Sequence, residues 1–145
     1  MHEKERGTCA SMAALLRASA GVSAWGLSLS CIAGLALMLM LSRISLTCAM
    51  ALGGTALLGV LERYFTLRLR FDESLFQSLA RGDIISLGAM DLALNRLGLR
   101  SAKLQTERPL DERLRGTRQL LQRHTVVVAC QSTMFLLALM TQDLP

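Results

Sequence analysis

Residues 23–61 read SAWGLSLSCIAGLALMLMLSRISLTCAMALGGTALLGVL, and Arg43 is the one charged residue among them. Because an α-helix rises about 1.5 Å per residue and the hydrocarbon core of a bilayer is about 30 Å thick, each half of this stretch is close to the length of one membrane crossing. A third apolar run, TVVVACQSTMFLLALM at residues 125–140, follows after a long mixed segment. The pattern predicts an all-α integral membrane protein with three transmembrane helices.

The composition of the chain favours the same class. Hydrophobic residues make up 52% of the 145 residues, whereas aromatic residues make up only 4%. Leu, Ala, Met and Gly dominate the apolar runs, and this mixture suits close packing of helices in lipid.

The distribution of basic residues predicts how the chain is threaded. Of the sixteen Lys and Arg residues, three precede the first apolar run, one is Arg43, twelve lie between Arg63 and Arg123, and none follows the third run. Since cytoplasmic loops carry the excess of Lys and Arg, the N-terminus is predicted inside and the C-terminus outside. The expected location is a membrane of the bacterial inner-membrane type.

These features divide the chain into five segments. We expect a cytoplasmic N-terminal segment at 1–22, which includes a short helix lying at the membrane interface, and a transmembrane hairpin at 23–62. A cytoplasmic helical region at 63–123 follows, then a third transmembrane helix at 124–141 and an external tail at 142–145.

The cytoplasmic region is predicted to form a helical hairpin and a stalk. Residues 66–71 are expected to continue the second transmembrane helix, and Asp72 is expected to cap a new helix that breaks at 81–83. A second amphipathic helix ends at Gly98, and its apolar stripe at helical spacing is a candidate docking surface for a partner protein: Leu87, Met90, Leu94 and Leu97. From Pro109 onward a last helix is expected to run directly into the third span.

Small side chains recur along the predicted spans and are candidates for helix packing. The positions are Gly26, Ser30, Gly34, Ala49, Gly53 and Gly59. Such rows let two helix backbones approach closely, either within the hairpin or between copies of the chain. Gln131 is expected to act with them as a structural hydrogen bonder, through a backbone carbonyl or Thr55 of a neighbouring helix.

No sequence motif indicates a particular chemical reaction. The four cysteines lack metal-ligand spacing, and the common catalytic and nucleotide-binding motifs are absent. The two histidines, His2 and His124, look too isolated for a metal site or a catalytic pair, and Glu62 beside Arg63 looks like a solvated residue at a helix end. We therefore predict no catalytic residue, no metal and no cofactor.

The remaining predictions concern partners and function. Four arginines near the third span are candidates for contact with anionic lipid headgroups: Arg113, Arg115, Arg118 and Arg123. Nucleic-acid binding is not expected, because carboxylates are interleaved with the basic residues. The leading hypothesis is a non-enzymatic accessory or scaffold subunit of a membrane complex. The alternatives are a small oligomeric channel, holin-like or transport protein, and an enzyme acting on lipid at the inner face.

Overall fold

The computed structural model describes residues 3–40, 43–81 and 110–142, and these residues are almost entirely helical. The helices are α1 (Glu3–Ala18), α2 (Ala20–Met40), α3 (Leu46–Arg81) and α5 (Leu110–Thr141). No strand occurs in this part of the chain, so the prediction of an all-α fold is confirmed for it. Both prolines, Pro109 and Pro145, lie outside the described residues.

The helix ends follow local sequence signals. The Oγ of Ser45 accepts a hydrogen bond of 3.2 Å from the backbone N–H of Cys48, which makes Ser45 the N-cap of α3. Asp111 and Glu112 lie in the first turn of α5, where carboxylates favour the positive end of the helix dipole. Between α2 and α3, the N–H of Arg43 donates to the carbonyl of Met40 at 2.8 Å.

The chain separates into two compact units. Unit 1 consists of Met1–Arg17 and Leu69–Gln119, and unit 2 consists of Ala18–Arg68 and Leu120–Pro145. In unit 1 the buried apolar side chains come from α1 and from the last third of α3: Cys9, Met12, Ala13, Leu16, Leu69, Phe76 and Leu79. The hydroxyl of Thr117 donates to Asp72 at 3.0 Å and thereby joins α5 to α3.

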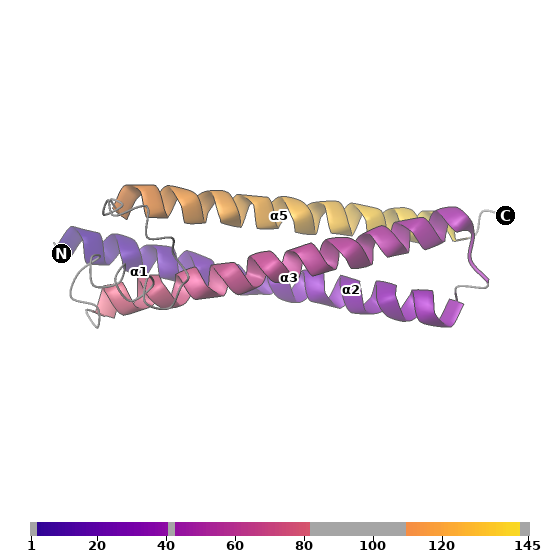
Figure 1. The fold of residues 1–145 in the computed structure, drawn as a ribbon, viewed down its shortest axis with the longest axis horizontal. Coiled ribbons are helices and arrows are strands. Elements are labelled where there is room, and N and C mark those ends of the chain that lie inside the picture. Colours follow the sequence, from indigo (N-terminus) through magenta and orange to yellow (C-terminus); the bar gives the residue numbers. More distant parts are fainter. Residues whose placement is uncertain (1–2, 41–42, 82–109, 143–145) are drawn as a thin grey trace, which may run out of the picture. The chain divides into compact units, whose positions relative to one another are not determined.

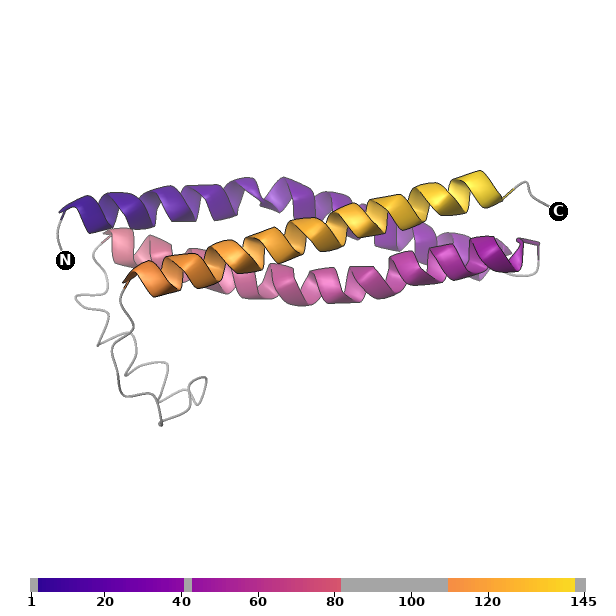
Figure 2. The same ribbon diagram turned by 90° about the horizontal axis from the view of Figure 1, so that it is seen from above.

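Unit 2 is a three-helix bundle of α2, the first part of α3 and the last part of α5, which run side by side in Figures 1 and 2. The thiol of Cys48 at the start of α3 donates to the carbonyl of Ala138 near the end of α5, at 3.4 Å. α3 is therefore antiparallel to α5, and α2 is antiparallel to α3. The core of this region consists of small and medium side chains: Ala33, Cys48, Ala51, Leu52 and Ala138.

The lengths of α3 and α5 test three predictions about the helices. α3 continues without a break from Leu46 to Arg81, so residues 66–71 extend the second apolar helix as predicted. The prediction that Asp72 caps a separate helix is wrong: Asp72 lies inside α3, where its carboxylate accepts a hydrogen bond from Thr117. α5 runs through His124 to Thr141, as predicted.

The apolar side chains of α1 differ in exposure. Met12 and Leu16 are buried in unit 1, whereas Leu15 is half exposed. The location of this helix at a membrane interface stays a prediction. Arg17 of α1 also pairs with Glu73 of α3 at 3.2 Å. The predicted helix at 84–97, with its stripe Leu87, Met90, Leu94 and Leu97, lies outside the described residues, as do residues 143–145 of the tail.

Candidate functional site: a buried polar cluster

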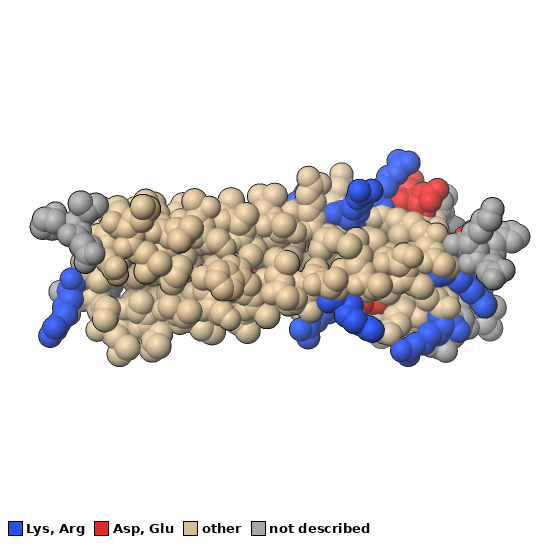
Figure 3. Space-filling model, turned by 180° about the vertical axis from the view of Figure 1, so that it is seen from behind, with Lys and Arg blue, Asp and Glu red and all other residues tan. Residues whose placement is uncertain are grey.

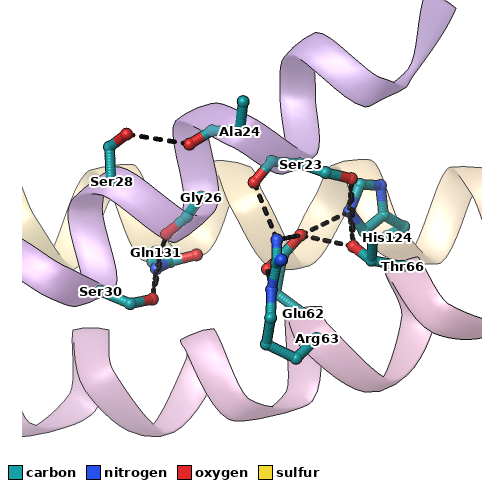
Figure 4. Close-up of polar contacts among 10 residues, drawn as sticks. All are labelled: Ser23, Ala24, Gly26, Ser28, Ser30, Glu62, Arg63, Thr66, His124 and Gln131. Carbon is teal, nitrogen blue, oxygen red and sulfur yellow. Dashed lines mark hydrogen bonds and ion pairs between the residues drawn. The ribbon is translucent and has the colours of Figure 1, made fainter.

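A carboxylate and an imidazole meet in the interior of unit 2. Glu62 on α3 and His124 on α5 are both completely buried, and the Oε1 of Glu62 lies 3.1 Å from the Nε2 of His124. The hydroxyl of Thr66, one turn after Glu62, donates to the same Oε1 at 2.7 Å. Figure 4 shows these side chains pointing toward one another from two helices.

Arg63 supplies a positive charge to this pair and a connection to α2. Its Nε lies 2.8 Å from the Oε2 of Glu62, and one of its terminal nitrogens lies 3.0 Å from Oε1. The same nitrogen donates to the backbone carbonyl of Ser23 at 2.9 Å. The guanidinium thus neutralises the carboxylate and bridges α3 to α2.

Ser23 completes the cluster from the α2 side. Its Oγ lies 3.0 Å from the hydroxyl of Thr66 and 3.4 Å from the Nε2 of His124. Because Thr66 gives its proton to Glu62, Ser23 is the donor in the bond to Thr66. We refer to Ser23, Glu62, Arg63, Thr66 and His124 as the polar cluster.

A second polar contact lies about two helical turns further along α5. The amide nitrogen of Gln131 donates to the carbonyl of Gly26 at 2.8 Å and to the Oγ of Ser30 at 2.7 Å. The expectation that Gln131 bonds a backbone carbonyl is therefore confirmed. Thr55 is not its partner, because the Thr55 hydroxyl donates to the carbonyl of Ala51 in its own helix.

Two glycines make these polar contacts possible. A Cβ at Gly26 would lie 3.2 Å from the Cγ of Glu62 and 3.3 Å from the Oε1 of Gln131, so a larger residue would crowd both side chains. A Cβ at Gly59 would overlap the side chain of Ser30. α2 approaches both neighbouring helices at these points because the side chains there are small.

The other predicted packing positions behave differently. Ser30 takes part in the contacts above, and Ala49 is partly buried. A Cβ added at Gly34 or Gly53 would meet no atom within 4 Å, so the contacts described above do not require glycine at either position, and the role of these two residues in packing stays a prediction. The helices touch at Gly26 and Gly59, where the side chains opposite them require the room.

The candidate lipid-contact arginines are distributed over both units. Arg113, Arg115 and Arg118 belong to unit 1, and Arg123 belongs to unit 2. Arg115, Arg118 and Arg123 are exposed, whereas Arg113 is partly buried. Arg113 is thus less accessible than the other three to a headgroup.

The geometry of the cluster differs from that of a hydrolytic triad. In such a triad the serine and the carboxylate bind opposite nitrogens of the imidazole. Here Ser23 and Glu62 both lie beside Nε2, while the Nδ1 of His124 is buried without a hydrogen-bond partner. Among the described residues no three His, Cys, Asp or Glu side chains are grouped in a way that would hold a metal ion. The chemistry that the cluster supports is charge pairing and proton exchange.

Two interpretations of the sequence are corrected by this site. Glu62 is not a solvated helix end, because the α2 and α5 helices cover it, and His124 is not isolated, because the antiparallel packing of α3 and α5 places it beside Glu62. A usable signal was present: Glu62 follows the second apolar run directly, and His124 directly precedes the third. Antiparallel neighbours bring such positions to the same depth.

Comparison with known proteins gives no relative. No family model, no curated protein and no solved structure matches this chain.

Proposed function

We propose that this protein is an integral membrane protein that serves as a non-enzymatic accessory or scaffold subunit of a membrane complex. The carrying observation is the inside-out character of unit 2, which buries polar side chains and exposes apolar ones. Large apolar side chains stand exposed on all three of its helices, among them Leu35, Met38, Leu57, Val60, Leu136 and Met140. A bilayer is the solvent that such a surface requires.

The dimensions of the helices support this proposal. Three segments are long and apolar enough to cross a membrane: Glu5–Met40, Leu46–Arg81 and Leu110–Thr141. The 36 residues of α3 are about 54 Å long at about 1.5 Å per residue, well beyond the roughly 30 Å of a hydrocarbon core. The charged ends of α3 and α5 therefore extend beyond the lipid in this arrangement.

The surface charge agrees with such a placement. α2 contains no charged residue, and α3 contains none before Glu62. Figure 3 shows, on one face, a broad surface with almost no charged atoms. With the positive-inside rule, this supports an N-inside, C-outside topology in a membrane of the bacterial inner-membrane type, with anionic headgroups near the exposed arginines.

The scaffold role rests on the stripe predicted within residues 84–97. Tagged protein purified in mild detergent should bring down a stoichiometric partner, identified by mass spectrometry. Leu94→Gln should abolish recovery of that partner and leave membrane abundance unchanged, whereas Asn95→Gln on another helical face should recover it normally. Loss of the Leu94→Gln protein from the membrane would instead make the stripe part of the fold, and unchanged recovery would remove the docking hypothesis.

A second candidate is a small oligomeric channel, holin-like or transport protein. The observation favouring it is the open space beside Gly34 and Gly53, which leaves these small positions available to another copy of the chain. Conductance in liposomes containing the purified protein would support this candidate. Partner recovery without conductance would support the scaffold.

A further inference from the structure

The charges around Glu62 leave one base without a partner inside unit 2. Both oxygens of the carboxylate accept hydrogen bonds, from Arg63, Thr66 and His124. Because a carboxylate only accepts, the Nε2 of His124 carries the hydrogen in this contact. In the neutral ring, Nδ1 then holds a free lone pair, and within the described residues this buried atom has no hydrogen-bond partner.

We propose that the Nδ1 of His124 is a proton-binding site in the interior of unit 2, and that proton uptake there makes the imidazolium compete with Arg63 as the counter-ion of Glu62. The proton comes from hydronium in the surrounding water: an O–H bond of hydronium breaks, an N–H bond forms at Nδ1, and the charge of the cluster rises by one. This inference does not depend on the scaffold role proposed above.

The surroundings of His124 identify Arg63 as the group that competes with it for the carboxylate of Glu62. From α2, the hydroxyl of Ser23 faces the ring. No charged residue faces the ring from this helix, because α2 contains none. From α3, they are Glu62, with its partner Arg63, and Thr66. On α5 itself the neighbouring Arg123 is exposed to the outside of the bundle. After proton uptake, two cations therefore share a single carboxylate.

Arg63 is also the partner that is free to move. Its side chain is 41% exposed, whereas the side chains of Glu62 and His124 are fully buried. A guanidinium at the edge of a bundle reaches water or headgroups easily, but an imidazolium in the interior has only Glu62 for its charge. Proton uptake should thus weaken the bond of Arg63 to Glu62 and, with it, the bridge from Arg63 to the carbonyl of Ser23.

The experiment uses the fact that the chain contains only two histidines. In His2→Gln, His124 is the only imidazole, and ¹⁵N-histidine NMR of the full chain in lipid nanodiscs reports both ring nitrogens. We expect Nδ1 to be unprotonated at pH 8 and protonated at pH 5, with Nε2 protonated throughout. A ring that keeps the same charge state between these pH values would overturn the proposal.

Three further variants in the His2→Gln background test the competition. Arg63→Gln should keep the ring charged at pH 8, because His124 becomes the only counter-ion, and Glu62→Gln should keep it neutral at pH 5. Arg68→Gln removes the same charge from an exposed residue of α3 and should titrate like the parent. If Arg63→Gln loses its helical circular dichroism, Arg63→Lys takes its place in the test. In Arg63→Lys the charged fraction of the His124 ring should be higher than in the parent at each pH. A charge state unaffected by either Arg63 variant would refute the competition.

Discussion

Glu62 shows how strongly the environment of one side chain depends on the helices that cover it. Its carboxylate lies at the end of an apolar run, yet helices from both sides exclude it from water. A buried ion pair contributes little compared with an apolar pair, but removal of one partner leaves an uncompensated charge. The polar cluster is therefore expected to be sensitive to single substitutions.

A neutral amide at position 62 tests the buried pair. Glu62→Gln removes the carboxylate that accepts from the buried donors of Thr66 and His124, and we expect it to lower the stability of the protein by about 1–3 kcal/mol. Glu112→Gln, at an exposed position in the first turn of α5, should cost less than about 1 kcal/mol. Thermal unfolding in detergent, followed by circular dichroism, measures both. Equal effects would mean that Glu62 is solvated after all.

The glycines of unit 2 fall into two groups, according to whether an added methyl group would meet another side chain. Gly59→Ala places a methyl group on the side chain of Ser30, and overpacking of this kind typically costs about 1–3 kcal/mol. Gly53→Ala meets nothing within 4 Å and replaces glycine by a better helix former, so its stability in the single chain should be equal or higher. The same unfolding assay compares the two, and a more harmful effect of Gly53→Ala would place Gly53 in an interface between copies.

At the scale of elements, α1 shows what a helical apolar stripe leaves undetermined. A narrow apolar stripe beside a predicted span suggested burial in the membrane interface. In unit 1, Met12 and Leu16 of this helix are buried, as are Leu69, Phe76 and Leu79 of α3. Periodicity alone does not distinguish these partners, because lipid and a neighbouring helix satisfy the same apolar face.

Adjacent leucines of α1 provide a direct comparison. Leu16 is only 3% exposed and Leu15 is 50% exposed. Leu16→Asp buries a carboxylate without a counter-ion and should release α1 from unit 1, at a cost of several kcal/mol. Leu15→Asp should have little effect in comparison. Amide hydrogen exchange of residues 3–18 measures the difference, and equal protection in both variants would contradict the packing of α1 described here.

At the scale of the whole molecule, the threading of the chain is the most general prediction. The twelve basic residues between Arg63 and Arg123, against one at Arg43, favour a cytoplasmic location for that segment. Reporter fusions at residue 95 and at the C-terminus should give opposite sides of the membrane, with residue 95 inside. Fusions that report the same side would show that α5 does not cross the bilayer.

Labelling of native cysteines complements the fusions. Cys31 and Cys130 are exposed on the bundle, and Cys9 and Cys48 are buried. A lipid-soluble maleimide should therefore modify Cys31 and Cys130 in membranes much faster than a charged reagent does. Rapid modification of both by the charged reagent would indicate that water, not lipid, surrounds unit 2.

The sequence by itself determined the class of the protein and the course of its long helices. Apolar runs of bilayer length, the absence of proline within them and the expected continuity of the chain through residues 66–71 and through His124 are local properties, so they predicted α2, the extended α3 and α5. The amide of Gln131 was also predictable as a hydrogen-bond donor to a backbone, because an amide in apolar surroundings requires a partner.

Only the tertiary structure decided which residues share the interior. The antiparallel packing of α3 and α5 joins Glu62 to His124 across 62 positions of the chain, and α2 then closes over both through Ser23 and Gly26. The same packing selects Gly26 and Gly59, and leaves Gly34 and Gly53 open, although all four belong to similar rows. Rotation and register of neighbouring helices set these contacts, and a pattern along one helix carries no information on the orientation of the next.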